Sequence, residues 1–349
     1  MLMIKHIVHI NFSITVGGID TMLVDILNEQ CKIARTTLVI INDKIDDTVL
    51  KTLNPEVRVI KINRKEGAKD VLKIFKLNMI LFKLNPSIIH CHNSNVVNFL
   101  VFKKCPIVLT VHDINYSTKS YHKYTHIFAI SKAVKRDIEK NGNFPVSVIY
   151  NGVNEQLIRR KTEQNNKEEF KLVIVSRLEH VKKGQDLALK AIKNLSSNYK
   201  VRLDLIGNGN SLAYLKNLTL ELGLNDKVNF LGVKSRNYIH ENLKNYDLLI
   251  QPSRYEGFGL TIVEAMFAKI PVLASDIDGP SEILNKGEFG FCFKSNNLED
   301  LILKLDAIIF NYTSFYNKSV NKAYLRAKEE FSISSTSKNY INYYKKILK

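Results

Sequence analysis

Short apolar runs alternate along the chain with segments in which apolar residues recur every three or four positions. The first run, residues 7–10, precedes a loop and then a helical pattern formed by Ile19, Met22, Leu23, Ile26 and Leu27. That spacing places the apolar side chains on one face of a helix. Repeated alternation of strand and helix predicts parallel sheets joined by crossover helices.

Two sets of strands are predicted, separated by a polar stretch without periodicity at residues 159–169, which predicts a linker. The first set comprises residues 7–10, 37–41, 57–60, 87–90, 107–111, 126–130 and 146–149. The second set comprises residues 170–175, 201–206, 228–231, 247–250 and 271–274. Near the end, Tyr340, Tyr344, Ile347 and Leu348 predict a terminal helix. We therefore expect an α/β protein with two doubly wound, Rossmann-like domains that face a cleft.

The composition fits two domains and an intracellular location. A chain of 349 residues that is 45% hydrophobic can form two cores. No apolar run approaches the length of a membrane-spanning helix, and the first ten residues are too interrupted for a secretory signal. The cysteines Cys31, Cys91, Cys105 and Cys292 are widely spaced, so neither a disulfide framework nor a structural zinc site is expected. We predict a cytoplasmic protein.

The net charge of +17 suggests acidic partners such as phosphates, anionic membrane or nucleic acid, although a diffuse surplus also serves solubility. A helix predicted at residues 64–84 carries Lys65, Lys69, Lys73, Lys76 and Lys83. These lysines fall on one stripe, opposite an apolar face that includes Leu72, Leu77, Ile80, Leu81 and Leu84. The stripe could dock on the inner face of the cell membrane, or the helix could be an ordinary solvated crossover. No nucleic-acid motif accompanies the charge, so nucleic acid is not an expected partner.

The most informative segment is residues 253–266, which follows the apolar run 248–250 and leads into a helical pattern. It places Glu256 and a glycine-rich turn at the carboxyl end of a strand, before a helix N-terminus that favours phosphate. Glu264 follows eight residues later; a helical path would separate the two by about 12 Å. Glycosidase carboxylate pairs lie about 5 to 9.5 Å apart, so these two predict contacts with different parts of one long ligand, unless the glycine turn folds back.

The segment EGFGLTIVEAMFAKIPVLASDIDGPSEIL resembles the nucleotide-sugar site of retaining glycosyltransferases of GT-B family 4, also called glycosyl transferases group 1. Further blocks occur in the family's order: VGGIDT, LTVHD, AISKAVKRDI, VIYNGVN, VSRLEHVKKGQD, LIGNGN and VNFLG. The resemblance extends from about residue 4 to residue 284. It implies an acceptor-binding domain at residues 1–160 and a nucleotide-sugar-binding domain at residues 165–330. It also implies that a helix at about residues 332–349 crosses back onto the first domain.

The resemblance assigns catalytic roles to Glu256, His112, Arg177 and Lys183. Arg177 and Lys183 would neutralise the diphosphate as the glycosidic bond breaks, which stabilises the transition state more than the ground state. Lys182 remains an alternative to Lys183, because the family usually places its lysine five residues after the arginine. The alternative without a functional role is that these cations are two solvated surface charges.

Donor binding is assigned to backbone and side-chain groups on both sides of the expected cleft. By resemblance, Glu256 faces the donor sugar together with the backbone of Gly257, Phe258, Gly259 and Leu260. Glu264 would accept hydrogen bonds from the ribose diol. Gly17 and Gly18 would form a loop close to the diphosphate or the acceptor, although such a pair is often only a turn. His112 ends a strand and would orient the donor sugar or handle a proton, although isolated histidines are more often structural.

No metal site or cofactor is expected. His90 and His92 share one face of a strand, but no third ligand lies nearby in the sequence, so we interpret them as a strand end. Asp276 and Asp278 resemble the manganese-binding Asp-x-Asp of glycosyltransferases with a different fold. Family 4 commonly has glycine at the position of Asp278, so the local loop contact differs here.

The sequence therefore predicts a retaining glycosyltransferase that moves a hexose-type sugar from a nucleoside diphosphate sugar to a glycan or lipid-linked glycan acceptor. The expected role is bacterial cell-surface polysaccharide or lipopolysaccharide synthesis. Two alternatives remain: a nucleotide-sugar epimerase on the same fold, and a non-catalytic subunit that binds nucleotide sugar. For the transferase, departure and attack on the same face of the sugar would explain retention without an enzymic nucleophile.

Overall fold

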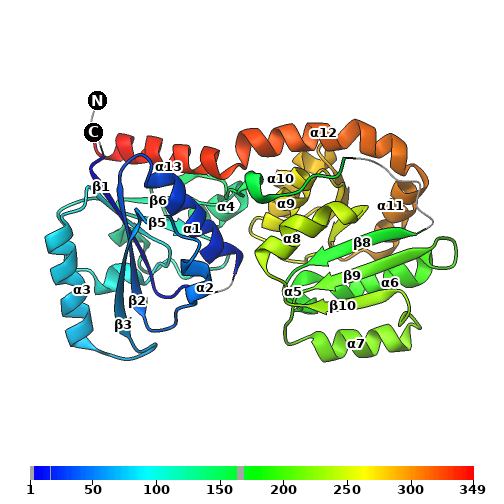
Figure 1. The fold of residues 1–349 in the computed structure, drawn as a ribbon, viewed down its shortest axis with the longest axis horizontal. Helices are drawn as coiled ribbons and strands as arrows, with labels where there is room; N and C mark the ends of the chain where they lie inside the picture. The colour runs from blue at the N-terminus through cyan, green and yellow to red at the C-terminus, as the bar shows by residue number, and fades with distance from the viewer. Residues whose placement is uncertain (1–3, 16, 163–168) are drawn as a thin grey trace. The chain divides into compact units, whose positions relative to one another are not determined.

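The computed structural model describes residues 4–15, 17–162 and 169–349. The chain divides into two compact units (Figure 1). The first domain consists of residues 1–153 and 332–349, and the second of residues 154–331. Part of the predicted linker at residues 159–169 lies outside the described residues. Its beginning is packed rather than solvated, because the buried Lys161 ammonium lies 2.6 Å from a carboxylate oxygen of Asp247.

The first domain contains a parallel sheet of seven strands in the order β3-β2-β1-β4-β5-β6-β7. The strands are β1 (His6–Asn11), β2 (Arg35–Asn42), β3 (Arg58–Arg64), β4 (Ile88–Cys91), β5 (Ile107–Val111), β6 (His126–Ala129) and β7 (Val146–Val148). The chain adds strands on one side of β1 as far as β3 and then crosses to β4 on the other side. The direction of sheet growth therefore reverses between β1 and β4, a position at which doubly wound folds bind ligands.

The helices of the first domain other than α1 begin where a side chain caps them. They are α1 (Gly18–Gln30), α2 (Asp47–Leu50), α3 (Val71–Leu84), α4 (Lys132–Lys140) and α13 (Ile333–Ile347), with short 3-10 turns η1 (Val96–Phe99) and η2 (Tyr121–Lys123). Asp70 caps α3 by accepting the amide hydrogen of Lys73 at 3.0 Å. The C-terminal helix α13 packs beside α1 (Figure 1), and the Thr336 hydroxyl donates to the carbonyl of Tyr150 at 2.9 Å.

The second domain contains a six-stranded parallel sheet in the order β10-β9-β8-β11-β12-β13. Its strands are β8 (Phe170–Val175), β9 (Val201–Ile206), β10 (Val228–Gly232), β11 (Leu248–Gln251), β12 (Val272–Ser275) and β13 (Phe291–Phe293). Its helices are α5 (His180–Lys183), α6 (Gln185–Leu195), α7 (Leu212–Glu221), α8 (Arg236–Asn242), α9 (Leu260–Ala268), α10 (Asp278–Ile283), α11 (Leu298–Phe310) and α12 (Tyr312–Glu330), with the 3-10 turns η3 (Glu155–Leu157), η4 (Leu243–Asn245) and η5 (Asn285–Gly287). Apolar residues of β8, β9, β11, α6 and α11 form a continuous core.

The predicted fold class is confirmed: each domain is a Rossmann-like parallel sheet with crossover helices. All the predicted strands are present, and β13 is an additional one of three residues, too short to give a clear periodic signal. The predicted helix at residues 64–84 was wrong at its start, because Arg64 ends β3 and α3 begins at Val71. Among the described residues, no helix is both long and apolar enough to cross a membrane.

Candidate functional site

The candidate site of the second domain lies where the direction of sheet growth reverses. β8 and β11 are neighbours and run parallel, so their carboxyl ends meet at one edge of the sheet. Arg177 follows β8, and Glu256 follows β11. Ligands of open α/β sheets bind outside such strand ends. The topology thus brings together two segments of the chain that the sequence analysis had singled out separately.

Lys183 and Glu256 form the charged centre of this site. The Lys183 ammonium lies 2.6 Å from Oε2 of Glu256, and each side chain is only 17% exposed. The side-chain amide of Gln251, the last residue of β11, donates to the same oxygen at 2.9 Å. Charge-assisted hydrogen bonds of this kind fix orientation as well as charge. Glu256 is therefore held as an oriented acceptor at the strand ends.

Gly184 brings the lysine to the glutamate. Its φ of +67° lies in the left-handed region, and a Cβ atom there would overlap the carbonyl oxygen of Pro252. The turn between α5 and α6 therefore packs backbone to backbone against the segment after β11. The amide of Arg254 donates to the carbonyl of Lys182 at 2.8 Å, which ties the same two segments together. Lys183, rather than Lys182, is the lysine whose ammonium contacts Glu256.

A second ion pair supports the turn that carries Glu256. Arg254 donates two hydrogen bonds of 2.9 Å to the two carboxylate oxygens of Asp186 on α6, and a third of 2.6 Å to the carbonyl of His180. Burial acts to raise the pKa of Asp186, but the hydrogen bonds and charge of Arg254 outweigh it, so the pKa lies below its usual value. This pair was not predicted from the sequence, because the two residues are 68 positions apart.

Glu264 lies on α9 as predicted, and its Oε1 is 3.2 Å from Nε2 of the buried His240. The estimate of a helical path from Glu256 to Glu264 was wrong. Helix α9 begins only at Leu260, after Gly259 turns the chain with a φ of +116°. No side chain caps α9. Its first amide groups therefore retain the partial positive charge of a helix N-terminus, which attracts anions.

The turn before α9 packs closely against Phe331 and against the start of α10. The Phe258 side chain is 3% exposed and packs edge-on against Phe331 at 5.7 Å, so the ring belongs to the core. A Cβ atom at Gly279, in α10, would lie 2.5 Å from the carbonyl oxygen of Glu256. Glycine is therefore needed at 279. The neighbouring Asp278, which departs from the family pattern, occupies the first position of α10.

Arg177 differs from Lys183 in its surroundings. Its side chain is exposed, and among the residues that the structure describes it has no hydrogen bond or ion pair. An exposed guanidinium at a strand end can receive two phosphate oxygens without breaking an existing bond. The site thus combines one cation held by a carboxylate with one that is open to an anion.

In the first domain, Gly17 is the N-cap residue of α1, with an extended backbone (φ −176°) that any residue can adopt. No atom outside its chain neighbours lies within 4 Å of the place where a Cβ would stand. Neither backbone strain nor packing therefore requires glycine at 17. The space is open, and no side chain caps the helix that starts at Gly18.

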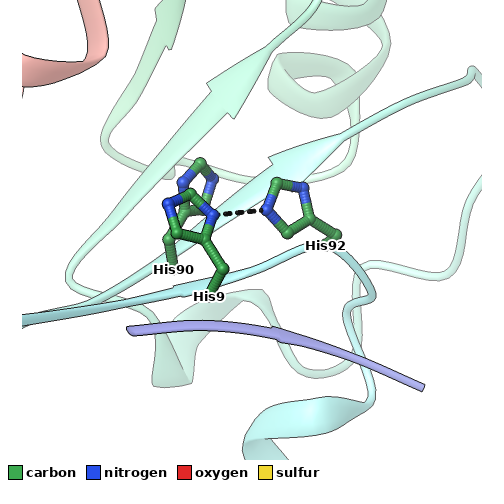
Figure 2. Close-up of side chains that lie close together, drawn as sticks. All are labelled: His9, His90 and His92. Atoms are coloured by element: carbon green, nitrogen blue, oxygen red, sulfur yellow. Dashed lines mark hydrogen bonds between the residues drawn. The ribbon is translucent and has the colours of Figure 1, made fainter. Parts of the chain in front are cut away.

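His112 follows β5 and is the end of a chain of buried histidines at the strand ends of the first sheet. Nε2 of His112 lies 3.4 Å from Nδ1 of His92, and Nε2 of His92 lies 2.9 Å from Nδ1 of His9 (Figure 2). Nε2 of His9 in turn lies 2.7 Å from the carboxamide oxygen of Gln30. The strand order places β1 beside β4 and β4 beside β5, which aligns the three rings.

Burial keeps these histidines neutral. It lowers the pKa of His9 and of His112 to about 4, and that of His92 well below its usual value. With the Gln30 oxygen accepting from His9, each ring donates through Nε2 and accepts through Nδ1. The chain then ends at Nδ1 of His112, which is buried and has no hydrogen-bond partner among the residues that the structure describes.

The fold places a third histidine, His9, beside His90 and His92, although no third ligand lies near them in the sequence. Nitrogen atoms of His9, His90 and His92 lie within 4.8 Å of one another, with His90 beside His9 (Figure 2). Both nitrogens of His90 are engaged, by the Tyr344 hydroxyl at 2.6 Å and the Thr110 hydroxyl at 2.7 Å. The cluster is therefore hydrogen-bonded throughout, and it ties α13 to the sheet.

The chain has relatives of known and unknown role among glycosyltransferases. The family model described as "Glycosyl transferases group 1" matches residues 155–326, and that described as "Glycosyltransferase Family 4" matches residues 16–157. The lipopolysaccharide 1,6-galactosyltransferase of Salmonella typhimurium is 25% identical over 84% of this chain and 86% of its own length. The O-antigen chain mannosyltransferase RfbU of the same organism is 31% identical over 51% of this chain and 54% of its own length.

Among solved structures, Alr3699/HepE of Anabaena in complex with UDP and glucose superposes with a TM-score of 0.80. The match covers 97% of this chain and 99% of that one at 20% sequence identity, which establishes a shared fold.

We predict that the buried histidines make stability depend on pH. In the unfolded chain a histidine titrates near 6.5, whereas His9 and His112 titrate at about 4 in the folded protein. As the pH falls from about 6.5 to 4, the unfolded state binds protons that the folded state does not, so stability falls by up to about 1.4 kcal/mol per pH unit for each histidine. Urea unfolding followed by circular dichroism measures this slope. His112→Asn should reduce it, and the exposed His122→Asn should not; equal slopes for all three proteins would contradict the prediction.

Proposed function

Because the chain belongs to the GT-B glycosyltransferases of family 4 (glycosyl transferases group 1), we propose that it is a retaining enzyme that moves a hexose-type sugar from a nucleoside diphosphate sugar to a glycan. The relatives in lipopolysaccharide and O-antigen synthesis suggest a cell-surface polysaccharide or lipopolysaccharide as the product. In this proposal the second domain binds the nucleotide sugar, and the first domain binds the acceptor.

The observation that carries the proposal is the Lys183–Glu256 pair at the carboxyl ends of β8 and β11. A nucleoside diphosphate sugar presents a dianionic diphosphate beside a ring of hydroxyl groups. Lys183 and Arg177 supply the positive charge for the first, and Glu256 supplies hydrogen-bond acceptors for the second. The uncapped N-terminus of α9 adds backbone donors at Gly259 and Leu260. We also assign the backbone of Gly257 and Phe258, which precede the helix, to the donor sugar.

Charge development explains how these groups would accelerate transfer. As the bond between the sugar and the diphosphate breaks, negative charge grows on the leaving oxygen. Fixed cations stabilise that charge more in the transition state than in the bound donor. Glu256 is occupied by Lys183 and Gln251, which suits a positioning acceptor better than a nucleophile. Attack from the face that the diphosphate leaves, with the diphosphate taking the acceptor proton, gives retention.

Glu264 would bind the ribose. Its carboxylate has two acceptor oxygens, and His240 holds one of them at 3.2 Å. A vicinal diol can donate to a carboxylate held in this way. From the first domain, we assign His112 to the donor sugar and the Gly17–Gly18 segment to the diphosphate or acceptor. Neutral His112, with an unpartnered Nδ1, can accept a hydrogen bond from a hydroxyl group.

We expect turnover with a nucleoside diphosphate hexose, and a product whose anomeric configuration matches that of the donor. Incubation with UDP-, GDP- and ADP-hexoses and glycan acceptors, followed by NMR of the product, measures both. Glu256→Gln and Lys183→Gln should each lower kcat by about 100-fold or more, the usual effect of removing one charge-stabilising group. Lys190→Gln, an exposed lysine on α6, is the matched control. Donor epimerisation without an acceptor, or donor binding without turnover, would overturn the proposal.

We expect transfer without a divalent metal. The exposed Arg177, together with Lys183 once the diphosphate competes for it with Glu256, supplies positive charge at the strand ends, which is the role that a metal ion has in other transferases. Activity measured after treatment with EDTA should equal that of untreated enzyme. Loss of activity that added manganese restores would contradict this prediction.

A membrane acceptor is supported by the surface of α3, where the structure corrects the predicted helical wheel. Leu72 was placed on the buried face, but it is 81% exposed, and Phe75 is 64% exposed. Met79 and Phe82, which are 42% and 45% exposed, continue the same side of the helix. We call the four residues Leu72, Phe75, Met79 and Phe82 the α3 row. The core side of the helix is formed by Leu77 and Leu81, both fully buried. An exposed apolar row of this size is typical of an interaction surface.

Lysines border the α3 row. At 100° per residue, Lys73, Lys76 and Lys83 fall within about 100° of the row on one side. The ammonium of Lys104 lies 5.5 Å from the centre of the Phe82 ring. Helix α3 itself contains no acidic residue. Apolar side chains beside cations match an anionic lipid surface, in which rings enter the acyl boundary and ammonium groups meet headgroups. We therefore propose that the enzyme works at the inner face of the cell membrane.

We predict that the protein floats with phosphatidylcholine vesicles that contain phosphatidylglycerol, and much less with phosphatidylcholine alone. Phe75→Ser and Phe82→Ser should each lower the partition coefficient by about tenfold, because a buried phenylalanine contributes about 1.5–3 kcal/mol. Phe310→Ser, at an exposed phenylalanine of the second domain, is the control and should bind as wild type. Equal binding of all variants would contradict a role for the α3 row.

A further inference from the structure

A cavity of about 420 Å³ opens in the first domain, within the size range of small-molecule sites. It lies where β1, β2 and β3 end and where the chain leaves β4, next to the reversal of the strand order. Its lining residues are Asn11, Phe12, Ser13, Asp20, Asn42, Arg64, Glu66 and Asn93. None of them was identified from the sequence, because they come from five separate segments of the chain.

Uncharged hydrogen-bonding groups dominate the lining. Asn11, Asn42 and Asn93 each carry an amide that donates and accepts, and Ser13 adds a hydroxyl. Asn11 donates to a carboxylate oxygen of Asp20 at 3.1 Å, and the Thr15 amide donates to the other oxygen at 2.8 Å. Such a set of mixed donors and acceptors, with carboxylates beside them, matches the hydroxyl groups of a sugar.

The charges of the lining are unfavourable to an anion. Asp20 and Glu66 provide two carboxyl groups, and Arg64 is the cation among the lining residues. Arg64 is only 6% exposed; it donates to Asn42 at 2.7 Å and to the carbonyl of Ala68. Its guanidinium also lies over the Phe99 ring at 5.2 Å. Both terminal nitrogens of Arg64 are engaged, although its buried Nε has no hydrogen-bond partner among the described residues. The Lys44 ammonium lies 3.9 Å from Oε2 of Glu66, but Lys44 does not line the cavity, and both side chains are 63% exposed, so solvent screens this pair. A phosphate or carboxylate in the cavity would therefore meet two carboxyl groups and one cation that is largely engaged.

We propose that this cavity binds a neutral, hydroxyl-bearing sugar residue of the acceptor and discriminates against a residue that carries a carboxylate or phosphate there. The proposal rests on the proposed function, in which the first domain binds the acceptor. The carboxylates of Asp20 and Glu66 accept from sugar hydroxyls, while the asparagine amides donate to ring and hydroxyl oxygens. The exposed carboxylate of Glu66, which forms a solvent-screened pair with Lys44 at 3.9 Å, is the main source of discrimination, because Asp20 is hydrogen-bonded to Thr15 and Asn11.

Two probes that differ at one carbon test this directly. Methyl β-glucoside and methyl β-glucuronoside have the same ring, but the second carries a carboxylate. Titration of the full chain followed by NMR should show the glucoside binding at least tenfold more tightly, with shifts confined to lining residues such as Asn11, Asn42 and Asn93. Equal or tighter binding of the glucuronoside, no binding of either, or shifts elsewhere would overturn the proposal.

Variants of Glu66 separate charge from folding. Glu66→Lys reverses the charge at an exposed position and should raise the affinity for the glucuronoside at least tenfold relative to the glucoside. Glu56→Lys makes the same change at an exposed glutamate outside the cavity and should leave the ratio unchanged. An unchanged ratio in Glu66→Lys would also overturn the proposal. Neither titration uses a nucleotide sugar, so absence of donor turnover would count against the proposed function and not against this cavity.

Discussion

Two backbone segments of the second domain are in direct contact because Gly184 has no side chain. Its left-handed conformation and the carbonyl of Pro252 leave no room for a Cβ atom. That contact fixes the distance between the end of α5 and the segment after β11. The 2.6 Å ion pair between Lys183 and Glu256 depends on this contact. A side chain at position 184 would push the two segments apart, and the Lys183 ammonium could then not reach the carboxylate in the same geometry. Gly279 has the same role on the other side of the turn, against the carbonyl of Glu256.

Ion pairs decide which cations near this turn remain available to an anion. Arg254 is neutralised by Asp186, so it holds the turn without adding a free cation. Lys183 is paired with Glu256, whereas the side chain of Arg177 is exposed. A diphosphate that approached would therefore meet Arg177 first and would compete with Glu256 for Lys183. Such competition would leave Glu256 oriented by Gln251 and open one position on its carboxylate to sugar hydroxyls, which couples diphosphate binding to sugar binding through one lysine.

The fold was predictable because the strand and helix periods run through almost the whole chain. Glu256, Lys183 and Gly184 were also recognisable, since their local order follows the family pattern. The side chains that these residues contact on other strands and helices were not predictable from the sequence. His9 and His92 are 83 positions apart, and Arg254 and Asp186 are 68 positions apart; only the strand order brings them together. Helix α3 shows a different limit: Leu72 was grouped with Leu77 and Leu81, but at 100° per residue it lies about 140° and 180° from them, and it faces solvent.

Net charge illustrates why composition alone could not locate a binding site. The surplus of +17 predicts anionic partners for the molecule as a whole. Within the first domain, however, α3 carries three lysines and no acidic residue, whereas the cavity at the strand ends carries Asp20 and Glu66. A surface that attracts phosphate and a cavity that repels it can serve one acceptor only if that acceptor has both an anionic, membrane-bound end and a neutral sugar end. Lipid-linked glycans have this combination, so the proposed membrane surface and the proposed sugar cavity would together suit such an acceptor better than a free charged sugar.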